Sequence, residues 1–235
     1  MSPTLAAWSV HLYTGLGAAI GFFALAAIAQ GNYRLAFFWM ALAIFIDCTD
    51  GTLARRLRVK EVLPHFDGSK LDDIVDYLNY VVVPLALAYH AALIPGGVTG
   101  LALASLPVLA SAYGFCQAEA KTADHFFTGF PSYWNVVVFY FYVLATATWV
   151  NALLLVLFSI LVFVPIRYLY PSRSSVARRT THALGVAWGV CVVILLAQLP
   201  APSRTLAWGS LFFPIYYFGV SLGLHFCPSL SGDHR

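Results

Sequence analysis

Long hydrophobic runs, separated by short polar connections, dominate this chain. Each run approaches the roughly 20 residues that an α-helix needs to cross the hydrocarbon core of a bilayer. Eight such runs occur, at residues 8–30, 34–55, 70–93, 98–117, 132–149, 150–169, 182–199 and 204–226. The pattern predicts an all-α fold, a polytopic integral membrane bundle of about eight transmembrane helices.

The connections between successive helices are not equally well marked in the sequence. Glycine and proline mark the connections at residues 30–32, 95–97 and 200–202. Only Asn151, just after Trp149, divides the fifth run from the sixth, so seven spans also fit the pattern. No internal repeat divides the chain, and we expect a single integral domain over residues 1–235. The first run has no basic residue before it, which favours a retained helix over a cleaved signal peptide.

The composition agrees with this class of protein. Hydrophobic residues make up 60% of the 235 positions and charged residues only 10%, with a mean hydropathy of +0.79. These values exclude an ordinary soluble globular domain. The four cysteines lie in different segments without metal-type spacing, so neither a zinc site nor a disulfide framework is indicated. Glycine pairs at 17 and 21, 185 and 189, and 219 and 223 have a spacing that can seat one membrane helix against another.

The basic residues predict how the bundle is oriented. In the eight-helix arrangement one side of the membrane holds Arg55, Arg56, Arg58, Lys60, Lys70, Lys121, Arg167, Arg173, Arg178, Arg179 and Arg235. The other side holds only Arg34 and Arg204. Because cytoplasmic loops carry the excess of Lys and Arg, both termini and the acidic residues described next belong on the cytoplasmic side. The net charge of +3 therefore reports orientation and contact with membrane lipids, and no nucleic-acid partner is needed to explain it.

Acidic residues gather in one short part of the chain. Seven of the ten acids fall between positions 47 and 76: Asp47, Asp50, Glu61, Asp67, Asp72, Asp73 and Asp76. On a helix, the five residues Asp47, Asp50, Gly51, Ala54 and Arg55 share one face, since they stand at i, i+3, i+4, i+7 and i+8. Gly68, Asp72 and Asp76 follow at i, i+4 and i+8 of a second helix. Two helices can therefore offer four carboxylates to one pocket.

Such a cluster needs a counter-charge. A carboxylate at mid-bilayer costs about 2.5 to 3.5 kcal/mol on insertion scales, so four would cost on the order of 10 kcal/mol. Divalent cations such as Mg²⁺ or Mn²⁺ prefer carboxylate oxygens, and a pair of them can hold the attacking and leaving oxygens of a phosphoryl displacement. Gly51, Ala54 and Gly68 leave room for a ligand against the helix backbone, and Arg55 can pair with a phosphate oxygen.

The order DxxDGxxAR followed by GxxxDxxxD resembles the signature of the CDP-alcohol phosphatidyltransferase family, with every fixed position present. The resemblance implies two divalent cations, Mn²⁺ or Mg²⁺, bound by Asp47, Asp50 and Asp72. Asp76 would then act as metal ligand, general base, or both. Gly51, Ala54, Arg55 and Gly68 would hold the cytidine and diphosphate of CDP-diacylglycerol.

Two further features indicate which branch of the family the chain resembles. Twelve residues separate Arg55 from Gly68, whereas most of the family has eight, and this spacer resembles the bacterial phosphatidylcholine synthase branch, as does the stretch at 117–135. That branch implies transfer of the phosphatidyl group to choline with release of CMP, at the bacterial inner membrane, with the active site facing the cytoplasm. Relatives are commonly dimeric, which makes a homodimer an expectation. The basic residues at 167–179 leave serine, inositol phosphate or glycerol phosphate open as the acceptor.

The acceptor pocket is harder to predict. Choline carries a quaternary ammonium, which aromatic faces and an acidic side chain can recognise. The candidates for contact with it are Tyr80, Glu119, Tyr133 and Trp134. Aromatic residues at a membrane interface are also common as simple anchors, so this alternative stays open.

The first helix departs from the family pattern. Many relatives carry a Pro-Asn pair near its cytoplasmic end, where this chain has His11 and Thr14. They can replace nucleotide contacts or be ordinary packed residues. Two other classes also use clustered aspartates: membrane prenyltransferases, which usually place Asp more densely and lack GxxAR, and cation transporters, in which an Arg beside the carboxylates serves no purpose.

Overall fold

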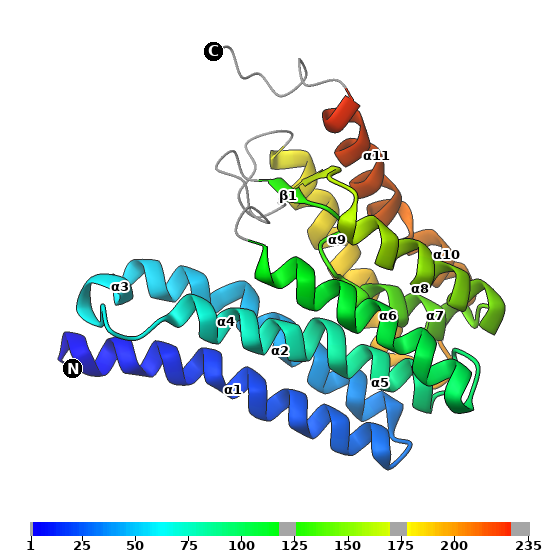
Figure 1. Ribbon diagram of the computed structural model, residues 1–235, viewed down its shortest axis with the longest axis horizontal. Coiled ribbons are helices and arrows are strands. Elements are labelled where there is room, and N and C mark those ends of the chain that lie inside the picture. Colours follow the sequence, from blue (N-terminus) through cyan, green and yellow to red (C-terminus); the bar gives the residue numbers. More distant parts are fainter. Residues whose placement is uncertain (1, 118–125, 170–177, 227–235) are drawn as a thin grey trace. The chain divides into compact units, whose positions relative to one another are not determined.

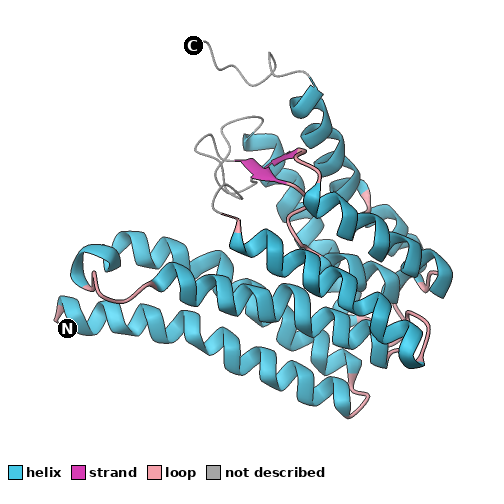
Figure 2. Cartoon of the chain, in the orientation of Figure 1, coloured by secondary structure: helices cyan, strands magenta, loops and turns pink. Residues whose placement is uncertain are grey.

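The computed structural model describes residues 2–117, 126–169 and 178–226 (Figure 1). Helices form most of this part of the chain, and its strands are confined to one short pair (Figure 2). The elements in order are α1 (Pro3–Ala29), α2 (Tyr33–Arg56), α3 (Val59–Val62), α4 (Gly68–Asp76), the π-helix η1 (Tyr77–Val82), α5 (Val83–His90), α6 (Gly97–Cys116), β1 (Phe126–Thr128), α7 (Trp134–Leu144), α8 (Thr148–Phe163), β2 (Arg167–Leu169), α9 (Arg178–Ala197), α10 (Arg204–Ser210) and α11 (Phe212–Phe226).

The all-α prediction is confirmed, but two boundaries were wrong. Helix α8 ends at Phe163, six residues before the end of the predicted run, because Pro165 disfavours helical geometry in the residue before it. The chain then enters β2, which pairs antiparallel with β1. The turn between the fifth and sixth runs lies at residues 145–147, earlier than predicted, with Ala145 in the left-handed region at φ 49°.

The eight predicted membrane spans are confirmed only in part. Among the described residues five helical segments are long and apolar enough to cross a membrane: Pro3–Ala29, Tyr33–Arg56, Gly97–Cys116, Arg178–Ala197 and Arg204–Phe226. The apolar helices α7 and α8 are shorter. The predicted run at 70–93 continues from α4 through η1 to α5, so its helix changes type. The chain is thus a membrane protein, and eight spans are not confirmed.

The described residues fall into two compact units, one within Met1–Ala92 and Trp134–Phe139 and the other within Leu93–Tyr133 and Tyr140–Arg235. In the first unit α1 packs along α2 and along α4, η1 and α5. Glycine makes the contact with α4 and η1 possible: a Cβ atom at position 17 would lie 2.5 Å from Val75 Cγ1, and one at position 21 would lie 2.9 Å from Asn79 Oδ1. The glycine pair predicted on the first helix therefore does seat one helix against another.

In the second unit α6 packs against α8, and β2 packs against α11. Trp188 on α9 donates its indole N–H to the Tyr140 hydroxyl at 2.8 Å, and that hydroxyl also meets Ser210 Oγ at 2.9 Å. The other two predicted glycine pairs, 185 with 189 and 219 with 223, lie in this unit. Neither pair makes a helix contact as close as that of Gly17 and Gly21. Cβ atoms at Gly189, Gly219 and Gly223 would meet nothing within 4 Å.

Candidate active site

The residues between Arg55 and Gly68 are folded against the first helix. Val59, at the start of α3, is only 3% exposed and packs with Ala7 and Val10 of α1. Phe66 places its ring 4.3 Å from the His11 imidazole, between ring centroids. Asp67 then caps α4, since its side chain accepts hydrogen bonds from the backbone N–H groups of Ser69 and Lys70. The long spacer therefore fixes where α4 begins, and with it the place of the aspartates on α4.

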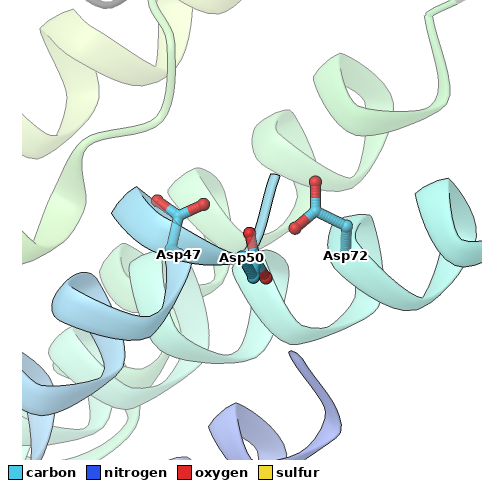
Figure 3. Close-up of side chains that lie close together, drawn as sticks. All are labelled: Asp47, Asp50 and Asp72. Carbon is cyan, nitrogen blue, oxygen red and sulfur yellow. The ribbon is translucent and has the colours of Figure 1, made fainter. Parts of the chain in front are cut away.

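Three of the four predicted carboxylates meet in space (Figure 3). Asp47 and Asp50 come from α2 and Asp72 from α4, and one oxygen of each lies within 4.8 Å of the others. Asp50 is buried at 5% exposure, while the other two are half-buried. Asp76 stands one turn further along and is not a member of this group. The predicted pocket of four carboxylates is thus a group of three with a fourth beside it in sequence.

Two hydroxyl groups bind these carboxylates directly. Thr14 on α1 donates to Asp50 Oδ2 at 2.8 Å, and this hydrogen bond is buried. Tyr80 in η1 donates to Asp47 Oδ2 at 2.5 Å. Thr14 lies in the stretch where the sequence departs from the family pattern, and its link to Asp50 crosses 36 residues of chain. The sequence offers Thr14 as a possible nucleotide contact or an ordinary packed residue, and contains no signal for its hydrogen bond to Asp50.

The donor set suits a hard divalent cation. Carboxylate oxygens are the ligands that Mg²⁺ and Mn²⁺ prefer, and three negative groups this close repel one another unless a cation lies between them. One carboxylate is almost fully buried, where an uncompensated charge is most unfavourable. The group Asp47, Asp50 and Asp72 can therefore hold a metal ion.

The small residues predicted to bind nucleotide have close protein neighbours. A Cβ atom at Gly51 would lie 3.2 Å from Arg55 Nη1, so the guanidinium lies over this glycine. Arg55 also donates from Nη2 to Thr52 Oγ1 at 3.1 Å and is itself exposed. At Gly68 a Cβ atom would lie 2.6 Å from His11 Cε1, so the imidazole fills the space that a side chain would need. Ala54 packs against the cluster of Ala7, Val10 and Val59.

The sequence comparisons bear on this arrangement. The family model for CDP-alcohol phosphatidyltransferase matches residues 12–165, which contain the three clustered aspartates and both hydroxyl donors. The chain belongs to this family. It is 43% identical over 233 residues to a protein of Legionella pneumophila named phosphatidylcholine synthase, covering 96% of this chain and 89% of that one. A protein of Pseudomonas aeruginosa with the same name is 37% identical over 195 residues, covering 83% and 82% of the two chains.

Membership of this family of transferases removes the membrane prenyltransferase and the cation transporter from consideration. It also accounts for the aspartates: a CDP-alcohol phosphatidyltransferase acts on a diphosphate, whose negative charge a carboxylate-bound divalent cation can offset. The sequence offers Tyr80 as a choline candidate and Thr14 as a possible nucleotide contact, but it does not predict that their hydroxyls bind the aspartates. These hydroxyls lie on α1 and η1, so three helical segments besides α4 contribute to the centre of this phosphatidyltransferase: α1, α2 and η1.

The four predicted acceptor contacts have different surroundings. Tyr80 uses its hydroxyl on Asp47, as described above. Trp134 is fully buried. Tyr133 is partly exposed, and its ring lies 6.4 Å from Phe127 and 6.2 Å from Tyr217, between centroids. Glu119 lies outside the described residues.

Proposed function

We propose that this chain is a phosphatidylcholine synthase, which transfers the phosphatidyl group of CDP-diacylglycerol to the hydroxyl of choline and releases CMP. The observation that carries the proposal is the 43% identity to a phosphatidylcholine synthase along almost the whole of both chains. The three aspartates that meet within 4.8 Å support the reaction class, because a phosphoryl transfer needs its charge neutralised.

The aspartates divide into two proposed roles. Asp47, Asp50 and Asp72 would hold two divalent cations, Mn²⁺ or Mg²⁺. When bound, the cations supply the positive charge that stabilises the diphosphate and its leaving oxygen. Gly51, Ala54, Arg55 and Gly68 would bind the cytidine and diphosphate. The exposed guanidinium of Arg55 supports this role, since it can donate paired hydrogen bonds to a phosphate.

Asp76 is proposed as the general base. Its carboxylate takes the proton of the choline hydroxyl while that oxygen forms a bond to the phosphorus nearest the diacylglycerol. The bond from this phosphorus to the CMP oxygen breaks, and CMP leaves with the bonding electron pair. A carboxylate held tightly by a cation is a poor base, so Asp76 would keep one oxygen free to take this proton.

The same proposal includes the membrane topology and the location of the enzyme. We expect one integral domain over residues 1–235 with about eight transmembrane helices, in the bacterial inner membrane, and an active site that faces the cytoplasm. The excess of basic residues on the side of the acidic cluster supports this orientation. We also propose a homodimer, because members of this family are commonly dimeric.

The acceptor can be decided by comparing the alcohols one at a time. Purified full-length protein with CDP-diacylglycerol and Mn²⁺ is offered choline, serine, inositol phosphate and glycerol phosphate in separate reactions, and lipid product and CMP are measured. We expect phosphatidylcholine as the main product. Turnover of another alcohol without choline product would refute the acceptor and leave the reaction class standing.

Arg55→Ala is expected to raise KM for CDP-diacylglycerol about tenfold, the equivalent of ~1.4 kcal/mol for one charged contact. The value of kcat should change less, because the contact is made to substrate and transition state alike. Initial rates of CMP release give both constants. Arg56→Ala is the matched control, since Arg56 is also exposed and stands one residue further on the helix. Unchanged constants in Arg55→Ala would remove its phosphate contact.

For the choline contact we keep Tyr80, Glu119, Tyr133 and Trp134 as proposals, and Tyr133 gives the sharpest test. Because an aromatic face attracts a quaternary ammonium by about 0.5 to 2 kcal/mol, Tyr133→Leu should raise KM for choline about 2- to 30-fold. Tyr133→Phe retains the ring and should keep the wild-type KM. Equal choline KM in all three proteins would exclude Tyr133 as a choline contact.

A further inference from the structure

Hydroxyl groups from two different elements reach the carboxylates of α2. Tyr80 donates to Asp47 Oδ2 at 2.5 Å, and Thr14 donates to Asp50 Oδ2 at 2.8 Å. In each case the hydroxyl occupies one side of one carboxylate oxygen and limits how the group can rotate. Partners of this kind orient metal ligands and often matter as much for affinity as the ligands themselves.

The backbone at Tyr80 has an uncommon form. Residues Tyr77–Val82 form η1, in which the N–H of Val83 donates to the carbonyl of Leu78, five residues earlier. Segments of π-helix are rare and occur frequently at functional sites. This one begins directly after Asp76, so it changes the direction of every side chain that follows on the helix.

Asn79 holds this turn in place. Its side-chain N–H₂ donates to the carbonyl of Val75 at 2.9 Å and to the carbonyl of Gly17 on α1 at 3.0 Å. Asn79 is only 4% exposed, so both hydrogen bonds are shielded from water. The turn is thereby fixed against α1, and its geometry puts the next residue, Tyr80, on Asp47.

We propose that Tyr80 is a positioning residue for the metal centre, and that Thr14 is its counterpart on Asp50. Each hydroxyl occupies one carboxylate oxygen, which would favour binding of a cation through a single oxygen of each carboxylate. Mg²⁺ and Mn²⁺ accept such ligands in compact octahedral sites, whereas Ca²⁺ takes six to eight oxygens and often binds carboxylates through both. The two hydroxyls would therefore favour Mg²⁺ and Mn²⁺ over Ca²⁺. This inference rests on the metal site of the proposed function and gives Tyr80 a role other than contact with choline.

The test is Mn²⁺ binding by the purified full-length chain, measured by electron paramagnetic resonance without CDP-diacylglycerol or choline. Tyr80→Phe, which keeps the ring, should bind Mn²⁺ about 10- to 100-fold more weakly. Ca²⁺ should displace Mn²⁺ from this variant at a lower ratio of Ca²⁺ to Mn²⁺ than from the wild type. Tyr89→Phe is the matched control, because it removes a tyrosine hydroxyl from α5 outside the carboxylate group, and it should match the wild type.

Thr14→Val gives an independent test with a smaller side-chain change, and the same two effects are expected in it. Wild-type affinity and wild-type Ca²⁺ competition in both variants would overturn the inference. A higher choline KM in Tyr80→Phe with unchanged Mn²⁺ binding would overturn it as well, and would return Tyr80 to the acceptor site. A wild-type protein that binds Mn²⁺ but makes no phosphatidylcholine would refute the proposed acceptor and leave the inference intact.

Discussion

Asp76→Asn is expected to lower kcat by about 10²- to 10⁴-fold, the usual contribution of a general base. The amide has nearly the shape of the carboxylate but cannot accept the proton of the choline hydroxyl. Since Asp76 is not one of the three aspartates whose oxygens lie within 4.8 Å, the variant should still bind Mn²⁺ and CDP-diacylglycerol within a few-fold of the wild type. Rates of CMP release give kcat, and titration of the detergent-purified protein gives both affinities.

The matched control for this variant is Asp73→Asn, the same change three residues earlier on α4 and also outside the group of three. It should retain most of the wild-type kcat. Wild-type turnover in Asp76→Asn would remove this residue from the base role. Loss of Mn²⁺ binding in the same variant would instead make Asp76 a metal ligand.

Asp50→Asn is expected to change activity and stability in opposite directions. Asp50 is 5% exposed and shares the 4.8 Å group with two other carboxylates, so without a cation its charge opposes folding. The variant should therefore melt at a higher temperature than the wild type in chelator. With Mn²⁺ at about 100 times its dissociation constant, binding adds ~2.7 kcal/mol to the wild type only, and the order should reverse. Turnover should fall by at least about 10²-fold, because one ligand of the charge-stabilising centre is lost.

Thermal unfolding with and without Mn²⁺ measures the stability effect. Thr14 can still hydrogen bond to an amide oxygen at position 50, so the comparison removes the charge and keeps the buried contact. Asp67→Asn is the control: Asp67 is an exposed helix cap, and asparagine caps equally well. Its melting temperature should respond to Mn²⁺ as the wild type does. A Mn²⁺ response of wild-type size in Asp50→Asn would argue against this residue as a metal ligand.

Helical spacing was enough to predict part of the centre. Asp47 and Asp50 are three residues apart on one helix, so local geometry alone puts them on one face. Asp72 could be added because a second amphipathic stripe follows after a short connection. The spacing also suggested that Asp76 would join them. How close Asp76 comes to the other three depends on how α4 lies across α2, and no periodicity within one helix contains that information.

The residues around the carboxylates were harder to foresee. The bond from Thr14 to Asp50 depends on the register of α1 against α2. Gly17 and Gly21 in addition allow α1 to approach α4 and η1 closely. The π-turn that directs Tyr80 to Asp47 leaves no mark in the hydrophobic pattern, since Asn79 fixes it through the carbonyl of Gly17, 62 residues away. Tyr80 was therefore predicted as an aromatic surface, while its hydroxyl makes the contact.

The number of spans shows the other limit of the hydrophobic pattern. Every apolar run contains a helix, yet the pattern counts apolar residues and does not mark where a helix ends. Helix α8 stops before Pro165, and α7 ends in the left-handed Ala145, so both are shorter than their runs. Local backbone geometry sets these ends.

The most direct test of the central claim is the stoichiometry of the reaction in proteoliposomes that contain the full-length chain, CDP-diacylglycerol, labelled choline and Mn²⁺. We expect phosphatidylcholine and CMP in equal amounts, formation of both to stop when the cation is chelated, and both to recover when Mn²⁺ is restored. CMP release without phosphatidylcholine, or phosphatidylcholine formed at the same rate in chelator, would contradict a carboxylate-bound cation centre that transfers the phosphatidyl group to choline.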